Sequence, residues 1–202
     1  MPAGRAPRRY DARMEAFALF ETSIGSCAIA WNARAIVGVQ LPEGSAQATR
    51  ARLRRRLPEA VEAVPAAHAR QAIDGIVALL AGTPVDLGDI ALDETAVGPF
   101  ERRVYAIART IPAGSTLTYG EIAARIDDPG AARAVGRALG SNPFAIIVPC
   151  HRVLAAGGRI GGFSAGGGAA TKRRILAIER ARVGDAPDLF ADEASSAAAR
   201  PA

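Results

Sequence analysis

Residues 118–140 read TYGEIAARIDDPGAARAVGRALG, and this stretch contains the signals of two short helices joined by a tight turn. Thr118 at the N-cap and Glu121 three residues later form a capping box, which predicts a helix over 119–126. A second helix is predicted over 130–139, because Asp-Pro supplies an N-cap and a proline at the first helical position, and a glycine follows the last turn. Two such helices predict a helix-turn-helix.

The second of these helices has two contrasting faces. One is an apolar stripe suited to a core, made of Ala131, Ala134, Val135, Ala138 and Leu139. The other consists of small residues and two arginines, namely Ala132, Arg133, Gly136, Arg137 and Gly140. A glycine inside a helix costs roughly 0.5–1 kcal/mol relative to alanine, so Gly136 indicates close approach to another surface. That surface is predicted to be DNA, with phosphates near the arginines; tight packing within the fold is the alternative.

The charge of the chain is distributed unevenly. The 202 residues carry a formal net charge of +5. Residues 1–95 are neutral, residues 96–184 carry 13 basic and 5 acidic side chains, and residues 185–202 are acidic. A compact basic region favours a polyanionic partner, with nucleic acid as the first candidate. A general preference for arginine is the alternative explanation.

The composition excludes several classes of protein. Half of the residues are hydrophobic, which argues against global disorder. Only two cysteines occur, Cys27 and Cys150, so a disulfide scaffold is excluded and a reducing compartment is favoured. The longest apolar stretches, 76–81 and 144–150, are far too short to span a bilayer, and the basic residues 1–9 lack the apolar core of a secretory signal. We therefore expect a cytoplasmic protein without a membrane partner.

The first half of the chain is expected to form a small α/β domain over 10–95, after a loose basic arm over 1–9. Short apolar segments predict an antiparallel meander, and helical segments follow. The predicted strands are 16–22, 27–31, 35–41 and, as a further possibility, 86–92, and the predicted helices are 46–57 and 66–81. Cys27 is expected to be a buried core thiol. A second, mostly helical domain is expected over 97–183, and a disordered tail over 184–202.

A run of arginines occupies the first helical segment of that α/β domain. Its members are Arg50, Arg52, Arg54, Arg55 and Arg56. Such a run is typical of a solvated helix face, although it could also contact a phosphate backbone.

The most reactive side chains lie in the stretch PCHRV at 149–153. The apolar run FAIIV over 144–148 predicts a buried strand, which places Cys150 at the end of a strand beside His151 and Arg152. Neighbouring positive charge lowers the pKa of a thiol, and the thiolate is the nucleophile, so Cys150 is a candidate reactive cysteine. A half-buried structural cysteine is the alternative. Adjacent side chains of a strand point to opposite faces, so Cys150 and His151 need a turn or a bridging water.

A last helix is predicted over 171–182. Glu179 lies at the border of its apolar face, and a buried carboxylate needs a hydrogen-bonded partner. His151 is a suitable partner. The alternative is a surface glutamate that pairs with Arg180 or Arg182, which would contribute little to stability.

Metal and nucleotide sites are not indicated by the sequence. Two cysteines and two histidines without a C-x-x-C pair do not supply a recognisable zinc site. The glycines do not form a G-x-x-x-x-G-K-[ST] loop. We therefore expect neither a metal nor a cofactor.

The stretch PCHRV, with Asn142-Pro143 ahead of it, resembles the motif of the O6-alkylguanine–DNA alkyltransferases, also called methylated-DNA–protein-cysteine methyltransferases. Supporting matches are YGEIA at 119–123, AARAVG at 131–136, GFS at 162–164, and Glu179. The resemblance covers 97–183, and over 10–95 it is architectural only. It implies a ribonuclease-H-like domain, a small antiparallel sheet with helices, followed by a mostly α, winged-helix-like domain that contains the helix-turn-helix.

The resemblance also implies a single-turnover reaction. Cys150 would accept the alkyl group from O6 of a flipped guanine, or from O4 of an alkylthymine, and the thioether would be stable. His151 would take the thiol proton through a water, and Glu179 would orient His151. Tyr119 would donate a proton or hydrogen bond to the departing O6. Asn142 would brace the turn around the site.

Contacts with DNA are implied in the same way. Arg133 would enter the duplex where the flipped nucleotide had been, and the helix would bind the minor groove through Ala132, Gly136, Arg137 and Tyr119. The guanine pocket would be lined by Leu139, Val153, Phe163 and Ser164; backbone carbonyls of Cys150 and Val153 and the N–H of Ser164 would read the base. The expected partner is double-stranded DNA carrying alkylated guanine, bound by a monomer without an obligate protein partner.

Two other functions stay open at this point. One is a sensor of alkylated DNA that performs no chemistry, against which the presence of Cys150 argues. The other is a hydrolase that uses Cys150, His151 and Glu179 as a triad. Multiple turnovers would favour the hydrolase, and strict single turnover would exclude it.

Overall fold

The fold is described for residues 15–181 and residue 183, from a computed structural model. The predicted basic arm over 1–9 and the predicted tail over 184–202 lie outside the described residues. Within the described part, no helix combines the length and the apolar character needed to cross a membrane.

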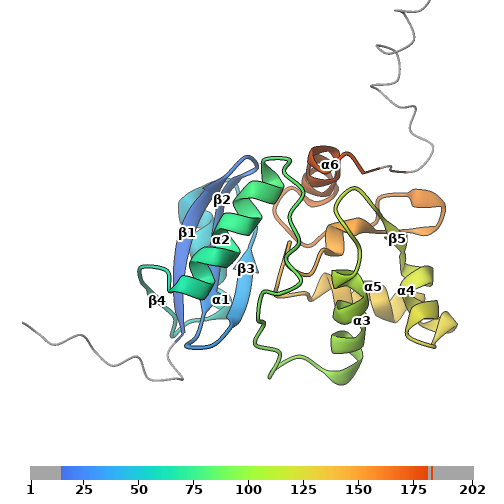
Figure 1. The fold of residues 1–202 in the computed structure, drawn as a ribbon, viewed down its shortest axis with the longest axis horizontal. Helices are drawn as coiled ribbons and strands as arrows, with labels where there is room; N and C mark the ends of the chain where they lie inside the picture. Colours follow the sequence, from blue (N-terminus) through green and yellow to red (C-terminus); the bar gives the residue numbers. More distant parts are fainter. Residues whose placement is uncertain (1–14, 182, 184–202) are drawn as a thin grey trace, which may run out of the picture.

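A four-stranded sheet forms the centre of the first half (Figure 1). Its strands are β1 (Ala16–Thr22), β2 (Gly25–Trp31), β3 (Ile36–Gln40) and β4 (Val61–Glu62). The order in space is β3-β2-β1-β4; the first three strands are antiparallel, and β4 pairs in parallel with β1. The predicted meander is confirmed. The sequence did not predict β4, because two exposed residues carry no alternating pattern.

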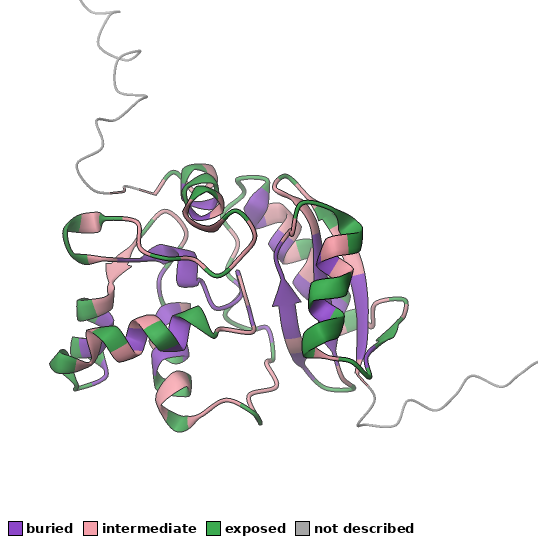
Figure 2. Ribbon diagram, turned by 180° about the vertical axis from the view of Figure 1, so that it is seen from behind, coloured by how far each residue is buried: buried purple, intermediate pink, exposed green. Residues whose placement is uncertain are grey.

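Both faces of this sheet are covered by helices. Ala18 of β1 packs in a cluster with α2 (Ala67–Leu80), whereas its neighbour Phe17 packs in a cluster with α1 (Ala46–Arg56). Adjacent residues of a strand point to opposite faces, so the two helices lie on opposite sides of the sheet. Figure 2 shows most of the sheet in the buried colour. Burial on both faces explains why the strands are nearly continuous apolar runs.

The second half is mostly helical. Its helices are α3 (Pro99–Arg109), α4 (Tyr119–Arg125), α5 (Ala132–Gly140) and α6 (Gly168–Ile178). Two short strands, β5 (Leu117–Thr118) and β6 (Val153–Leu154), pair in parallel. Three 3₁₀ turns are η1 (Pro129–Ala131), η2 (Cys150–Arg152) and η3 (Ala156–Gly158). Val104, Ile122 and Val135, one each from α3, α4 and α5, are fully buried in a shared core. The chain is thus a small mixed sheet with helices, followed by a helical half.

The local signals in 118–140 are confirmed with one adjustment. The Thr118 hydroxyl accepts from the backbone N–H of Glu121, and the Glu121 carboxylate accepts from the backbone N–H of Thr118 at 2.6 Å. The second helix begins as the 3₁₀ turn η1 after Asp128 and becomes α-helical at Ala132. Helix α6 begins at Gly168 and ends at Ile178, earlier at both ends than the predicted 171–182.

The two halves share part of a core. Ile146, Ile147 and Ile175 of the second half pack in the same cluster as the sheet and α2. The backbone N–H of Val39 in β3 donates to the carbonyl of Pro143 at 2.8 Å. The segment that precedes Cys150 is therefore held against the sheet.

The predicted strand over 86–92 is wrong, because this segment is a loop. Only Leu92 pairs, in an isolated bridge with Ile36 of β3. The Asp86 carboxylate accepts from the backbone N–H of Gly88 at 2.7 Å. This local turn competes with extended pairing.

The predicted strand over 144–148 is also wrong. The run forms a tight turn in which Ile146 has φ 73° and the N–H of Val148 donates to the carbonyl of Phe144 at 2.8 Å. The Asn142 side chain closes this turn: Nδ2 donates to the Val148 carbonyl, and Oδ1 accepts from the Phe144 N–H, both at 2.9 Å. A largely buried turn has the same apolar composition as a buried strand, so periodicity does not separate them.

Candidate functional site

Cys150 is the first residue of the 3₁₀ turn η2 rather than the end of a strand. Its backbone N–H donates to the Val148 carbonyl at 2.8 Å, and the N–H of Arg152 donates to the Pro149 carbonyl at 2.9 Å. In a strand, the neighbouring side chains of Cys150 and His151 would point to opposite faces. The structure has a turn at this position instead, as the sequence required.

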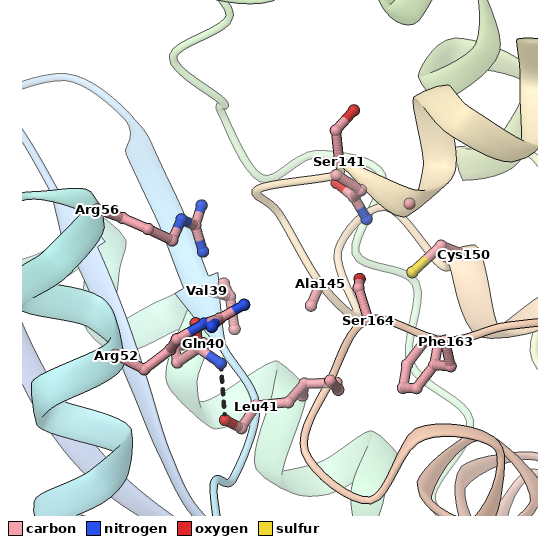
Figure 3. A pocket seen from close by; sticks show the side chains of 13 residues that line it. Val39, Gln40, Leu41, Arg52, Arg56, Ser141, Ala145, Cys150, Phe163 and Ser164 are labelled. Carbon is pink, nitrogen blue, oxygen red and sulfur yellow. Dashed lines mark hydrogen bonds between the residues drawn. The ribbon is translucent and has the colours of Figure 1, made fainter.

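The Cys150 side chain borders a cavity of about 220 Å³ between the two halves of the molecule (Figure 3). Asn142, Phe163 and Ser164 line the same cavity, so three residues that the sequence singled out lie together with the thiol. Leu139 and Val153 do not line it. They lie in the core of the second half, 4% and 0% exposed.

His151 and Glu179 are in contact, as predicted. His151 Nε2 lies 3.0 Å from Glu179 Oε1, and both side chains are buried. Arg152 binds the same carboxylate, with Nε 3.0 Å from Oε2 and Nη2 2.8 Å from Oε1, and its Nη1 donates to the carbonyl of Ile111 at 2.6 Å. The alternative of a surface glutamate is therefore wrong.

This network keeps Glu179 ionised. Burial alone would raise the pKa of Glu179, but hydrogen bonds from His151 and Arg152, together with their charges, lower that pKa to about 2. A carboxylate that accepts several hydrogen bonds is strongly stabilised in its charged form. At neutral pH the site therefore contains a buried negative charge beside the imidazole.

His151 is held in a form that can act as a base. Burial lowers the pKa of His151, and the hydrogen bond and charge of Glu179 oppose this effect. Because Nε2 faces the ionised carboxylate, Nε2 carries the hydrogen, which leaves the lone pair of a neutral ring on Nδ1. Nδ1 is buried and has no hydrogen-bond partner among the described residues.

The predicted lowering of the Cys150 pKa is wrong. Burial raises the pKa of the Cys150 thiol, and the Asn142 side chain and the charge of Lys172 oppose this effect only in part. Arg152 is turned toward Glu179, so it does not supply the cation that the sequence placed beside the thiol. The Cys150 thiol is therefore protonated at rest.

Cys27, the second cysteine, is buried in the core of the sheet, as predicted. Burial raises the pKa of its thiol to about 12. Both cysteines are free. Among residues 15–181 and 183, no group of three or more His, Cys, Asp or Glu side chains is placed to hold a metal ion.

Tyr119, the first residue of α4, lies half-buried near the thiol. A Cβ at Gly161 would approach the Tyr119 hydroxyl to 3.2 Å, so the glycine permits this close contact. Burial, followed by the charge of Cys150, raises the pKa of Tyr119. The phenol therefore stays protonated and can donate.

The arginines of α5 point away from the rest of the chain. Arg133 and Arg137 are exposed, and neither side chain forms a salt bridge or hydrogen bond within the described part. A Cβ at Gly140 would meet open space, whereas one at Gly136 would lie 3.9 Å from the Tyr119 ring. At 3.9 Å a Cβ would make an ordinary van der Waals contact, so the neighbouring Tyr119 ring does not require a glycine at 136, and Gly140 lies on the open face.

Comparison with known proteins shows the family of this chain. Residues 99–181 match the model described as 6-O-methylguanine DNA methyltransferase, DNA binding domain. A methylated-DNA–protein-cysteine methyltransferase of Mycobacterium leprae is 43% identical over 121 residues, which cover 59% of this chain and 70% of that protein. The chain belongs to the 6-O-methylguanine DNA methyltransferase family.

Two further members of this family are similar to the chain. The methylated-DNA–protein-cysteine methyltransferase of Mycolicibacterium paratuberculosis is 50% identical over 109 residues, 54% of this chain. That match spans 64% of the relative, which is less than two thirds of its length. The structure of Mycobacterium tuberculosis OGT in complex with DNA has a TM-score of 0.65 and 34% identity, and covers 84% of this chain and 95% of that chain.

The resemblance to the family did not single out Lys172. This residue of α6 is fully buried; its Nζ donates to the Val153 carbonyl at 2.5 Å and lies 5.9 Å from the centre of the Tyr119 ring. Burial lowers the pKa of Lys172, and Cys150 raises it. A signal was available in the sequence, because Lys172 is the only lysine of the chain and precedes Glu179 by two helical turns.

Proposed function

We propose that this protein repairs O6-alkylguanine in DNA by transferring the alkyl group irreversibly to its own Cys150. The observation that carries the proposal is Cys150 at the edge of a cavity, followed in the chain by a buried His151 that contacts the carboxylate of Glu179, in a chain of this family. O4-alkylthymine is a second possible substrate.

The first step is removal of the Cys150 proton. His151 Nδ1 would accept it through a water, which would also satisfy this buried nitrogen. The carboxylate of Glu179 would stabilise the imidazolium that forms. The raised pKa of Cys150 supports this step, because a thiol that is protonated at rest requires a base.

The second step is in-line displacement at the alkyl carbon. A bond would form between Cys150 Sγ and the carbon, and the bond from that carbon to O6 would break. Tyr119 would donate a hydrogen bond or proton to the departing guanine, and its raised pKa keeps that proton available. Asn142 would hold the turn that carries Cys150. The product is a stable thioether, so each molecule would react once, without a cofactor or metal.

The base must leave the helical stack before this chemistry, at a cost of a few kcal/mol. We assign the entry into the duplex to Arg133, whose exposed side chain has no partner within the described part. Helix α5 would lie in the minor groove through its small face, with Ala132, Gly136, Arg137 and Tyr119 as contacts. The DNA complex of the similar Mycobacterium tuberculosis protein supports a DNA partner.

The flipped guanine would bind beside Cys150. Phe163 and Ser164 would form the wall of its pocket, since both line the cavity. The backbone N–H of Ser164 and the carbonyls of Cys150 and Val153 would read the base edge. Leu139 would support the pocket from the core behind it.

We propose two domains, over 10–95 and 97–183. The strand order β3-β2-β1-β4 with β4 parallel to β1 supports a ribonuclease-H-like first domain. The packing of α4 and α5 against α3 around one core supports a winged-helix-like second domain with a helix-turn-helix. The protein would act as a monomer in the cytoplasm, on double-stranded DNA.

The experiment that tests this function is mass spectrometry after mixing with a duplex that contains O6-methylguanine. We expect one methyl group per protein, on the peptide that contains Cys150, and none in the matched variant Cys150→Ala, which keeps its DNA binding. Binding without any adduct would favour a lesion sensor. Repeated turnover of an ester or amide would favour a Cys-His-Glu hydrolase.

A further inference from the structure

Tyr105 of α3 places a hydroxyl group in the core of the second half, where a phenylalanine would fill nearly the same space. Its side chain is buried, and its hydroxyl donates to the carbonyl of Ala138 in α5 at 2.9 Å. Burying a hydroxyl costs free energy unless it forms a hydrogen bond, so this bond explains how the core accommodates a polar group. Burial raises the pKa of Tyr105, so the phenol keeps the hydrogen that it donates.

The acceptor of this bond belongs to the end of α5. The last four carbonyl groups of a helix have no N–H partner within that helix, and Ala138 lies two residues before the last residue of α5, Gly140. The hydroxyl of Ser141, which follows the helix, also donates to the Ala138 carbonyl, at 3.0 Å. The Ser141 bond is local to α5, whereas the Tyr105 bond joins α5 to another helix. Tyr105 therefore fixes the end of α5 relative to α3.

The other helix of the proposed helix-turn-helix is held by α3 in the same way. The side chain of Arg103 donates to the carbonyl of Ile126, the residue at which α4 ends. Arg103 and Tyr105 are two residues apart in α3, and they bind the C-terminal ends of α4 and α5 respectively. Helix α3 thus holds both of these helices by a carbonyl group at their ends.

The ring of Tyr105 also contacts the turn that leads to the thiol. It packs edge-on against the ring of Phe144, with the ring centres 6.5 Å apart and the planes inclined by 89°, a favoured arrangement of aromatic rings. The Phe144 carbonyl accepts from the N–H of Val148, and the Val148 carbonyl accepts from the N–H of Cys150, both at 2.8 Å. One side chain therefore contacts both the end of α5 and the turn that precedes Cys150.

We infer that Tyr105 is a positioning residue that holds α5 at a fixed position relative to the Cys150 turn while DNA is bound. The inference rests on the proposed function, in which α5 lies in the minor groove and the flipped base reaches Cys150. The flipped base stays attached to its strand, so the position of α5 relative to the thiol decides how closely the base and the sulfur meet. A free base enters the cavity without this constraint. The Tyr105 hydroxyl should therefore matter for duplex DNA and not for a free base.

The test uses Tyr105→Phe, which removes the hydroxyl and keeps the ring. Single-turnover transfer to Cys150 is measured with a saturating O6-methylguanine duplex and with free O6-benzylguanine. We expect the rate on the duplex to fall about fivefold, the usual effect of losing one hydrogen bond, and the rate on the free base to stay unchanged. The Ala138 carbonyl keeps the Ser141 hydroxyl as a donor, so the variant should fold. Urea denaturation checks that it is folded under the assay conditions.

Thr110→Val is the matched control. It removes a hydroxyl at the end of the same helix that donates at 2.8 Å to the carbonyl of Ile107, within α3 rather than to α5. This control should change neither rate.

The outcomes separate the inference from the function on which it rests. An unchanged rate on the duplex in folded Tyr105→Phe would overturn the inference. Equal losses on the duplex and on the free base would assign Tyr105 to general support of the fold, and would also overturn it. Failure of the unmodified protein to transfer a methyl group to Cys150 would instead overturn the proposed function.

Discussion

The imidazole of His151 and the carboxylate of Glu179 are 28 residues apart in the chain and 3.0 Å apart in the fold. Arg152 donates to both oxygens of the same carboxylate, so the pair does not bury an uncompensated charge. A buried charge that loses one partner is strongly destabilising, whereas a complete network is tolerated. The site thus depends on all three side chains, although only two belong to the proposed proton transfer.

The first prediction concerns Glu179→Gln. The amide removes the charge that stabilises the imidazolium of His151, so the single-turnover rate of alkyl transfer should fall by about 100-fold or more. Because Arg152 keeps its buried charge beside a neutral group, the free energy of unfolding should fall by about 3 kcal/mol. Rates on an O6-methylguanine duplex and urea denaturation check both effects. Glu62→Gln removes an exposed carboxylate and serves as the control, since exposed ion pairs contribute about 1 kcal/mol at most. Equal rates for Glu179→Gln and the control would contradict the role of Glu179.

The second prediction concerns stability in acid. The pKa of Glu179 is lowered from 4.5 to about 2, so its contribution to stability is present above pH 4.5 and is lost as the pH falls toward 2. The free energy of unfolding should therefore fall more steeply over this range in the unmodified protein than in Glu179→Gln. Urea denaturation at a series of pH values measures both slopes. Parallel curves would show that the carboxylate titrates alike in the folded and unfolded chains.

The third prediction concerns the pH dependence of the rate. His151 must be neutral to accept a proton, and burial lowers its pKa below the ordinary 6.5, so the rate should be constant near neutral pH and fall on the acid side. Glu179 raises the pKa of His151, so the inflection should move to lower pH in Glu179→Gln. Single-turnover rates over the range measure this. A rate that instead rises through alkaline pH would indicate direct ionisation of Cys150.

Local signals made part of this fold predictable from the sequence. The capping box of Thr118 and Glu121 depends on neighbouring residues only, and the structure contains it. The run over 144–148 depends on what surrounds it: the Asn142 side chain and the adjoining sheet hold it in a turn, which its apolar composition does not reveal.

The candidate site likewise has one feature that the sequence predicted and others that depend on the surrounding structure. The contact between His151 and Glu179 was predicted from the need of a buried carboxylate for a partner. Other features depend on how the two halves pack, and the sequence did not predict them. They are the turning of Arg152 toward Glu179, the burial of Lys172 and the position of Arg56 at the cavity. The arginine run of α1 has the composition of a solvated helix face, and only packing distinguishes its members.

The fourth prediction concerns Arg133→Ala. Under the proposed function, Arg133 fills the space of the flipped nucleotide and offsets an unstacking energy of a few kcal/mol, so the reaction with duplex DNA should slow by about tenfold or more. The reaction with free O6-benzylguanine should not change, because no base is flipped. Arg137→Ala is the matched control on the same helix, and at saturating DNA it should have a smaller effect. Equal losses on duplex and free base would argue against entry into the duplex.

The last prediction concerns Asn142→Ala. The variant leaves the buried carbonyl of Val148 and the N–H of Phe144 without their side-chain partner, which should lower the free energy of unfolding by about 2 kcal/mol. The Asn142 amide also lowers the pKa of Cys150, so its loss should raise that pKa and slow both alkyl transfer and the reaction of Cys150 with iodoacetamide.

Urea denaturation and the pH dependence of alkylation measure the two effects of Asn142→Ala separately. Ser141→Ala is the neighbouring control: its exposed hydroxyl donates to the carbonyl of Ala138 at 3.0 Å, and its loss should change stability by about 0.5 kcal/mol or less. Lower stability together with an unchanged pH dependence of alkylation would show that Asn142 supports the turn without acting on the thiol. The site would then rely on Lys172 and the backbone alone to oppose the raised pKa of Cys150.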